Sequence, residues 1–240
     1  MRDPSRRLLL GAALALGASP ALAADPARDL VARTVERAIA WAGGRAALDR
    51  AKVLAWTGEA VIQAGGQTIA IGVDTTVRPF DYAHGISWPK AQGPTASREL
   101  LLENGQGVVV RQGVSSPMPE GMRRHETQQY AVYGLMRLLP LLEPGVTLTA
   151  LGTSEGLSWI EVVHPEAPVA RMGFEAGGRL ARLVDKVASP SGGGDIAQEF
   201  VFAGEISGGG VRWPKRLTIY QDGALFFDLT LATFSPRETL

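Results

Sequence analysis

GMRRHETQQYAVYGLMRLLPLL, residues Gly121–Leu142, is a long apolar helical pattern in the middle of a chain that otherwise reads as strands. Tyr130, Tyr133 and Met136 recur at a spacing of three and therefore share one face of a helix. Three leucines widen this face: Leu135, Leu138 and Leu139. Since the apolar arc is wider than a surface helix needs, we expect the helix to lie against a large apolar partner.

Runs of alternating apolar and polar residues on both sides of this helix predict that partner, a curved antiparallel sheet. The expected strands are residues 53–64, 67–77, 80–88, 98–103, 108–112, 146–151, 157–164, 169–176, 179–187, 196–206, 211–221 and 224–234. Two-residue turn signals such as Asp222–Gly223 join several of them, so successive strands should be antiparallel neighbours. A sheet of eleven or twelve strands is expected to curl. The predicted fold class is mainly β, of the α+β type.

The first 23 residues predict a signal peptide, with Arg2, Arg6 and Arg7 before an apolar run and an Ala-Leu-Ala cleavage site at 21–23. Ser-Arg-Arg-Leu-Leu-Leu at 5–10 also resembles a twin-arginine export signal, so Sec and Tat export both stay open. We therefore expect a periplasmic protein whose mature part, residues 24–240, forms a single domain.

Charge and cysteine content exclude several classes of protein. Without the three arginines and one aspartate of the predicted signal peptide, the 24 basic and 24 acidic residues become 21 and 23. This balance gives no reason to expect nucleic-acid binding. No later run is long and apolar enough for a membrane-spanning helix, and the absence of cysteine excludes disulfides, thiolate metal sites and a lipoprotein anchor. No stable membrane anchor is predicted.

Motifs associated with catalysis or metal binding occur only in fragments. Gly152–Gly156 matches the GxSxG pattern of hydrolases, but a strand rather than a helix follows it, so a hairpin turn is the preferred interpretation and a hydrolase using Ser154 the lesser one. His125-Glu126 begins an HExxH motif, yet Gln129 replaces the second histidine. We predict no catalytic residue, no metal site, no cofactor and no enzyme activity.

Three stretches resemble the periplasmic lipoprotein-carrier superfamily, which has the LolA/LolB-like fold. They are AGGRAAL at 42–48 after the first helix, VLAWTG at 53–58 and GVRWPKRL at 210–217. The resemblance implies an incomplete antiparallel barrel of about 11 strands, closed by a helical lid over a cavity that holds acyl chains of lipids or lipoproteins. It also implies that Tyr130, Tyr133 and Met136 belong to the lid.

Aromatic and aliphatic side chains expected on one face of the sheet complete the predicted ligand-binding set. His84 shares its strand face with aromatic residues and is expected to offer a ligand head one polar contact. The set is Trp56, Ile71, Tyr82, His84, Trp88, Tyr130, Tyr133, Met136, Phe174, Phe200 and Phe227. From sequence, a cavity lined by these residues cannot be separated from a solid core.

The predicted function is a periplasmic binding or carrier protein for a lipid, lipoprotein acyl chains or another apolar ligand. The alternative is a regulatory or interaction module of the same fold that acts on a protein partner in the cell envelope.

Overall fold

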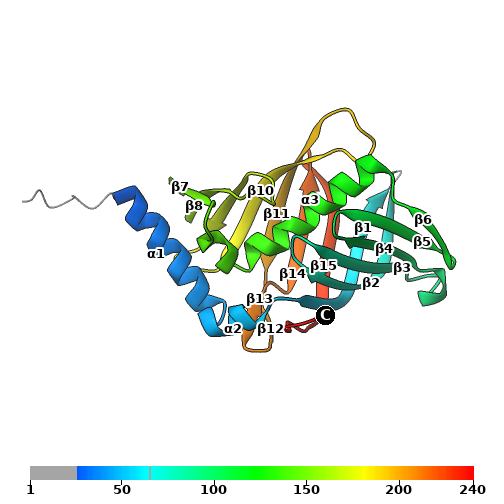
Figure 1. Ribbon diagram of the computed structural model, residues 1–240, viewed down its shortest axis with the longest axis horizontal. Helices are drawn as coiled ribbons and strands as arrows, with labels where there is room; N and C mark the ends of the chain where they lie inside the picture. The colour runs from blue at the N-terminus through cyan, green and yellow to red at the C-terminus, as the bar shows by residue number, and fades with distance from the viewer. Residues whose placement is uncertain (1–25, 65) are drawn as a thin grey trace, which may run out of the picture.

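A sheet of 13 antiparallel strands forms the centre of the computed structural model, which describes residues 26–64 and 66–240 (Figure 1). The strand order is β6-β5-β4-β3-β2-β1-β15-β14-β11-β10-β9-β8-β7. The sheet is curved and is not closed into a barrel. The predicted signal peptide, residues 1–23, lies outside the described residues.

The strands form two series that meet in the middle of the sheet. The first series is β1 (Leu54–Ala64), β2 (Gln67–Arg78), β3 (Tyr82–Pro89), β4 (Arg98–Glu103), β5 (Gln106–Arg111) and β6 (Val114–Pro117). The second is β7 (Thr147–Ser154), β8 (Leu157–Val163), β9 (Ala170–Phe174), β10 (Leu180–Ala188), β11 (Asp195–Ala203), β14 (Arg216–Gln221) and β15 (Ala224–Phe234). Pairing of β1 with β15 joins the first and last strands of the chain. A small hairpin of β12 (Ile206–Gly208) and β13 (Val211–Trp213) lies between β11 and β14.

Helix α3 (Glu120–Met136) connects the two series and crosses the inner face of the sheet (Figure 1). Its buried residues include Val132, Leu135 and Met136, as the apolar spacing in the sequence requires. Helix α1 (Pro26–Trp41) contacts β7, which forms one edge of the sheet. The short helix α2 (Arg45–Arg50) follows α1 and contacts it. Two 3-10 turns, η1 (Pro94–Ala96) and η2 (Leu139–Leu142), complete the elements.

The mainly β fold with a curved antiparallel sheet is confirmed, and the differences from prediction are local. Strand β6 was not predicted because its four residues are all exposed and show no alternation. The single strands expected at 196–206 and 211–221 are each divided, the first at Gly204 with its φ of 63° and the second at Pro214, which lacks an N–H.

The helix predicted for residues 121–142 ends earlier than expected. Leu138 adopts a φ of 66°, which an α-helix does not accommodate, and the chain continues as η2 around Pro140. Within the part of the chain that the structure describes, no helix has the length and apolar character needed to cross a membrane.

Candidate ligand-binding site

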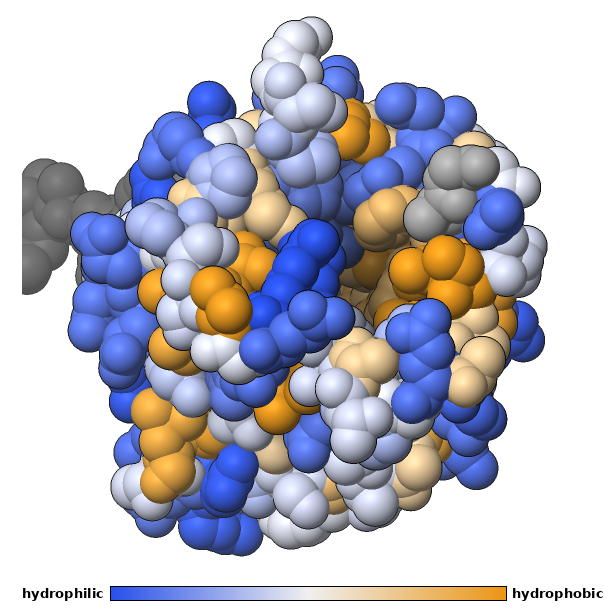
Figure 2. Space-filling model, turned by 90° about the vertical axis from the view of Figure 1, so that its right-hand side faces the viewer, coloured by the Kyte–Doolittle hydropathy of each residue, from blue (hydrophilic) through white to orange (hydrophobic). Residues whose placement is uncertain are grey.

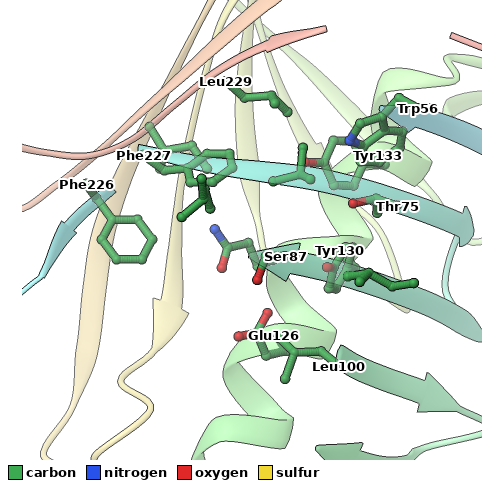
Figure 3. A pocket seen from close by; sticks show the side chains of 16 residues that line it. Trp56, Thr75, Ser87, Leu100, Glu126, Tyr130, Tyr133, Phe226, Phe227 and Leu229 are labelled. Atoms are coloured by element: carbon green, nitrogen blue, oxygen red, sulfur yellow. The ribbon is translucent and has the colours of Figure 1, made fainter. Parts of the chain in front are cut away.

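A cavity of about 180 Å³ lies between α3 and the inner face of the sheet, over β1 to β4 and the adjacent β15 and β14 (Figure 3). Strands β1 to β4, β14 and β15 supply its floor and walls, and α3 covers it. The lining residues are Trp56, Ile71, Val73, Thr75, Gly85, Ile86, Ser87, Leu100, Glu126, Gln129, Tyr130, Tyr133, Ile219, Phe226, Phe227 and Leu229. Most of them are apolar.

Aromatic contacts fix one end of the cavity. The rings of Trp56 and Tyr133 lie 4.8 Å apart at 49°, and the rings of Tyr130 and Tyr133 lie 6.0 Å apart (Figure 3). Tyr130 can lie on β3 because residue 85 is glycine: a Cβ there would be 2.7 Å from the Tyr130 hydroxyl oxygen. The glycine thus sets how closely α3 approaches the sheet.

An irregularity in β15 places two consecutive phenylalanines at the cavity. Ile219 pairs with Phe227, but the next residue, Tyr220, pairs with Leu225, so that Phe226 is an extra residue in β15. In a regular strand neighbouring side chains point to opposite faces. Because of the bulge, Phe226 and Phe227 both line the cavity (Figure 3).

The ionisable groups that line the cavity are few, and burial raises the pKa of each. Burial raises the pKa of the Glu126 carboxyl, an effect that His125 and Arg98 oppose. Burial also raises the pKa of Tyr130 and Tyr133 well above the usual range of a phenol, so both hydroxyls are uncharged at neutral pH. The cavity therefore offers an apolar interior with hydrogen-bonding groups on its α3 side.

Arg98 on β4 is one of the two groups whose charge lowers the pKa of the Glu126 carboxyl, and His125 has the larger effect. The half-buried guanidinium of Arg98 contacts the Sδ of Met122 at 3.7 Å, and its Nε has no hydrogen-bond partner among the residues that the structure describes. Burial lowers the pKa of Arg98, which the Glu126 carboxylate partly restores.

The outer surface is hollowed at this end of the molecule. Figure 2 shows the face that lies to the right in Figure 1, with a hollow whose floor and one side are apolar. Hydrophilic residues surround the other side of the hollow. Such an apolar recess with a polar border is typical of a binding site for an apolar ligand.

Five of the predicted ligand-binding residues line the cavity, namely Trp56, Ile71, Tyr130, Tyr133 and Phe227. The prediction missed others, among them Val73, Leu100, Glu126 and Phe226. Alternation on β2 could have identified Val73, which lies two residues from Ile71. No signal in the sequence marks the bulge that brings Phe226 inward.

The expectation that the aromatic face of residues 80–88 lines the cavity is wrong. Gly85, Ile86 and Ser87 of β3 line it instead, whereas Tyr82, His84 and Trp88 do not. Gly85 and Ser87 pair with the lining residues Thr75 and Val73 of β2, while Trp88 pairs with Gly72, which is not a lining residue. Trp88 covers Gly72, and His84 Nε2 lies 3.0 Å from an oxygen of Glu99. Tyr82, His84 and Trp88 face outward because Gly85, on the inner face, leaves space for Tyr130.

Met136, Phe174 and Phe200 were also expected at the cavity but lie in the packed core, with exposed fractions of 5%, 0% and 1%. There α3 packs directly on β10, and no cavity-lining residue comes from β8 to β11. The inner face of the sheet thus carries a cavity over β1 to β4, β15 and β14 and a packed core over β8 to β11.

The sequence motifs considered for catalysis have structural places. Gly152–Gly156 lies in the hairpin of β7 and β8: Ser154 is the last residue of β7, and only Glu155 and Gly156 form the turn, where Glu155 pairs with Arg182. His125 is buried and donates from Nδ1 to the carbonyl oxygen of Ala188 at 2.8 Å. No group of three His, Asp or Glu residues within 26–64 and 66–240 is arranged to hold a metal ion.

Comparison with solved structures identifies the fold. A LolA superfamily protein from Nitrosomonas europaea superposes with a TM-score of 0.54 at 10% identity, over 90% of this chain and 96% of its own. A DUF1329 family protein from Desulfovibrio piger gives a TM-score of 0.56 at 9% identity, over 88% and 94% of the two chains.

The chain has a LolA-like fold. A domain from Vibrio parahaemolyticus whose name refers to outer membrane lipoprotein sorting is also similar, with a TM-score of 0.50 at 8% identity over 87% of this chain and 91% of its own. No family model and no curated protein matches the sequence. In this LolA-like fold, the cavity lies between α3 and the sheet.

Proposed function

We propose that this protein is a periplasmic binding or carrier protein that holds an acyl chain of a lipid or lipoprotein, or an apolar group of similar size, in the cavity under α3. It acts by binding and not by covalent catalysis. The observation that carries the proposal is the cavity itself, with aromatic and aliphatic walls beneath a single crossing helix.

The size of the cavity limits what it holds in this conformation. Its volume of about 180 Å³ is below the roughly 300–1,000 Å³ of sites for drug-sized ligands. A single narrow chain fits such a space better than a bulky ring system. Each methylene group that leaves water contributes about 0.8 kcal/mol, so even a short buried segment of chain gives useful affinity.

The LolA-like fold and the name of the similar Vibrio domain support a carrier role in the envelope. The signal peptide expected at residues 1–23 supports export to the periplasm. Neither identifies the lipid, so the ligand class has to come from binding experiments on this protein.

A matched pair of variants on β4 tests the proposal. Leu100 lines the cavity, whereas Leu101 points to the other face of the same strand. Leu100→Trp fills the cavity and should weaken binding of an apolar fluorescent probe by at least tenfold, while Leu101→Trp should bind like the wild type. Equal affinity of the two variants would show that the probe does not enter this cavity.

Lipid extraction and native mass spectrometry of detergent-free protein would identify a co-purified amphiphile.

An interaction module is the second candidate function, and the free edge of β6 favours it. All four residues of β6 are exposed, Val114 to 70%, and β6 ends the sheet. An extended peptide can add to such an edge by backbone hydrogen bonds. A protein that takes up no apolar probe but captures a defined envelope peptide would favour this function over lipid binding.

A further inference from the structure

Three polar side chains form a row on the inner face of the sheet, next to the cavity. Asp185 of β10 pairs with Gln198 of β11, which pairs with Gln221 of β14. We call this row the acid–amide strip. The residues two positions before or after them on the same face are apolar: Leu183, Phe200 and Ile219.

Most polar atoms of the acid–amide strip are buried without a hydrogen-bond partner among the residues that the structure describes. Asp185 and Gln198 are exposed to only 4% and 1%. Both carboxylate oxygens of Asp185, both amide atoms of Gln198 and Nε2 of Gln221 have no partner. Burying polar atoms in this way costs stability, and apolar residues of similar size would be more favourable. The strip is therefore expected to serve something other than folding.

Helix α3 covers the acid–amide strip with few polar contacts to the sheet. Two of its side chains bind the last residue of β10: His125 donates to the carbonyl oxygen of Ala188, and Gln128 accepts from its N–H at 2.7 Å. Asp185 lies three residues earlier on the same strand. Lifting the N-terminal half of α3 breaks these two bonds and exposes the strip.

The acid–amide strip lies beside the cavity on the inner face of the sheet. Ile219 lines the cavity, and Gln221 lies two residues farther along β14 on the same face, a step of about 7 Å. Glu126 and Gln129 of α3 also line the cavity. A ligand chain lying in the cavity can thus place its end on the strip without leaving the inner face of the sheet.

We propose that the acid–amide strip binds the head of an amphiphile, and that this head is a cationic, N–H-bearing group such as an ammonium. This rests on the proposed function, in which the cavity takes the acyl chain. An ammonium donates several hydrogen bonds, and the carboxylate of Asp185 and Oε1 of Gln198 can accept them.

The charges around the strip favour this class of head over an anionic one. Asp185 and Glu126 are both carboxyls, so a carboxylate or phosphate head would meet groups of its own sign. Arg98 is on β4, on the opposite side of the cavity from β10. Burial raises the pKa of Asp185 to about 7, and no cation within residues 26–64 and 66–240 opposes this shift. A cationic head supplies a charge that opposes it.

The test compares three amphiphiles with the same twelve-carbon chain below their micelle concentrations: dodecylammonium, dodecanoate and monododecanoylglycerol. Binding is measured at pH 7.5 by displacement of an apolar fluorescent probe from the full mature chain. The wild type should bind dodecylammonium about tenfold more tightly than dodecanoate, the range expected for one charge-assisted hydrogen bond. Asp185→Asn should abolish this preference.

Asp195→Asn is the matched control, because it removes the same charge from an exposed position at the start of β11. It should keep the preference, which separates the strip from the net charge of the protein. If all three amphiphiles bind equally, or if Asp185→Asn keeps the preference, the inference is wrong while the cavity function stands. If none binds, the proposed function fails as well.

Gln198→Leu gives a second measurement if the asparagine variant does not fold. It removes the neighbouring acceptor and leaves the charge of Asp185 in place. A weaker preference for dodecylammonium in this variant supports the strip as the head-group site, and an unchanged preference overturns it.

Discussion

Replacement of Asp185 by asparagine should change how the stability of the protein depends on pH. Burial raises the pKa of this carboxyl from 3.8 to about 7 in the folded protein. Between these values the folded state holds a proton that the unfolded state has lost. The contribution of the protonated Asp185 carboxyl to the free energy of unfolding is therefore fully present below pH 4. It is lost as the pH rises through 7.

The magnitude follows from the difference between the two pKa values. At about 1.36 kcal/mol per unit, the full loss is about 4 kcal/mol, of which roughly 3 kcal/mol falls between pH 5 and pH 8. Asparagine has nearly the same shape and no titration. The free energy of unfolding of Asp185→Asn minus that of the wild type should thus increase by roughly 3 kcal/mol from pH 5 to pH 8.

Urea unfolding followed by tryptophan fluorescence at both pH values measures this difference. The difference is used because the pKa of Glu126 is also raised and adds a slope of the same sign to both proteins. Asp195→Asn, at an exposed site, should show the pH dependence of the wild type. Parallel curves for wild type and Asp185→Asn would refute the reasoning, since they would mean that water or a cation already solvates the carboxyl.

Two further substitutions test the packing and the surface charges. Gly134→Ala in α3 should destabilise the protein by about 2 kcal/mol in urea unfolding, because the new Cβ would lie 2.3 to 2.8 Å from ring atoms of Phe80, which stacks on His164. Gly177→Ala, where a Cβ meets nothing within 4 Å, should leave stability nearly unchanged, and equal effects would contradict the close contact. Arg216→Ala should raise the pKa of Asp228, which the hydrogen bonds from Arg216 lower, while stability at pH 7 changes little because Arg216 is exposed and Thr218 still donates to the Asp228 carboxylate. NMR titration of Asp228 measures this shift, and an unaltered pKa would show that the ion pair does not form in solution.

The sequence was most informative where a single period decides which face is buried. A spacing of three on α3 identified Tyr130 and Tyr133, and alternation on β2 identified Ile71, because each pattern has one apolar face. On β3 the same reasoning failed. Both faces of that strand are partly covered, and the space needed by Tyr130 decides that the small residues turn inward.

Two features of the site lay beyond any pattern in the chain. The bulge that turns Phe226 inward depends on pairing between β14 and β15, which are adjacent in sequence but shift register between Ile219 and Tyr220. Cavity and core use the same residue types, so Phe200 was placed with Phe227 although only Phe227 lines the cavity. Whether a residue lines the cavity or lies in the core depends on the distance between α3 and the sheet at that point. This distance is a property of the tertiary structure.

Pairing of β1 with β15 also determines when the protein can finish folding. The hydrogen bond between Val53 N–H and the carbonyl oxygen of Arg237, together with the Thr57–Thr233 contact, joins positions that are about as far apart in the chain as they can be. A chain emerging from the ribosome holds β1 with one edge unpaired until β15 appears. Contacts of such long sequence separation form slowly. During this interval the free edge of β1 can pair with a wrong strand, and pairing with β15 removes that possibility.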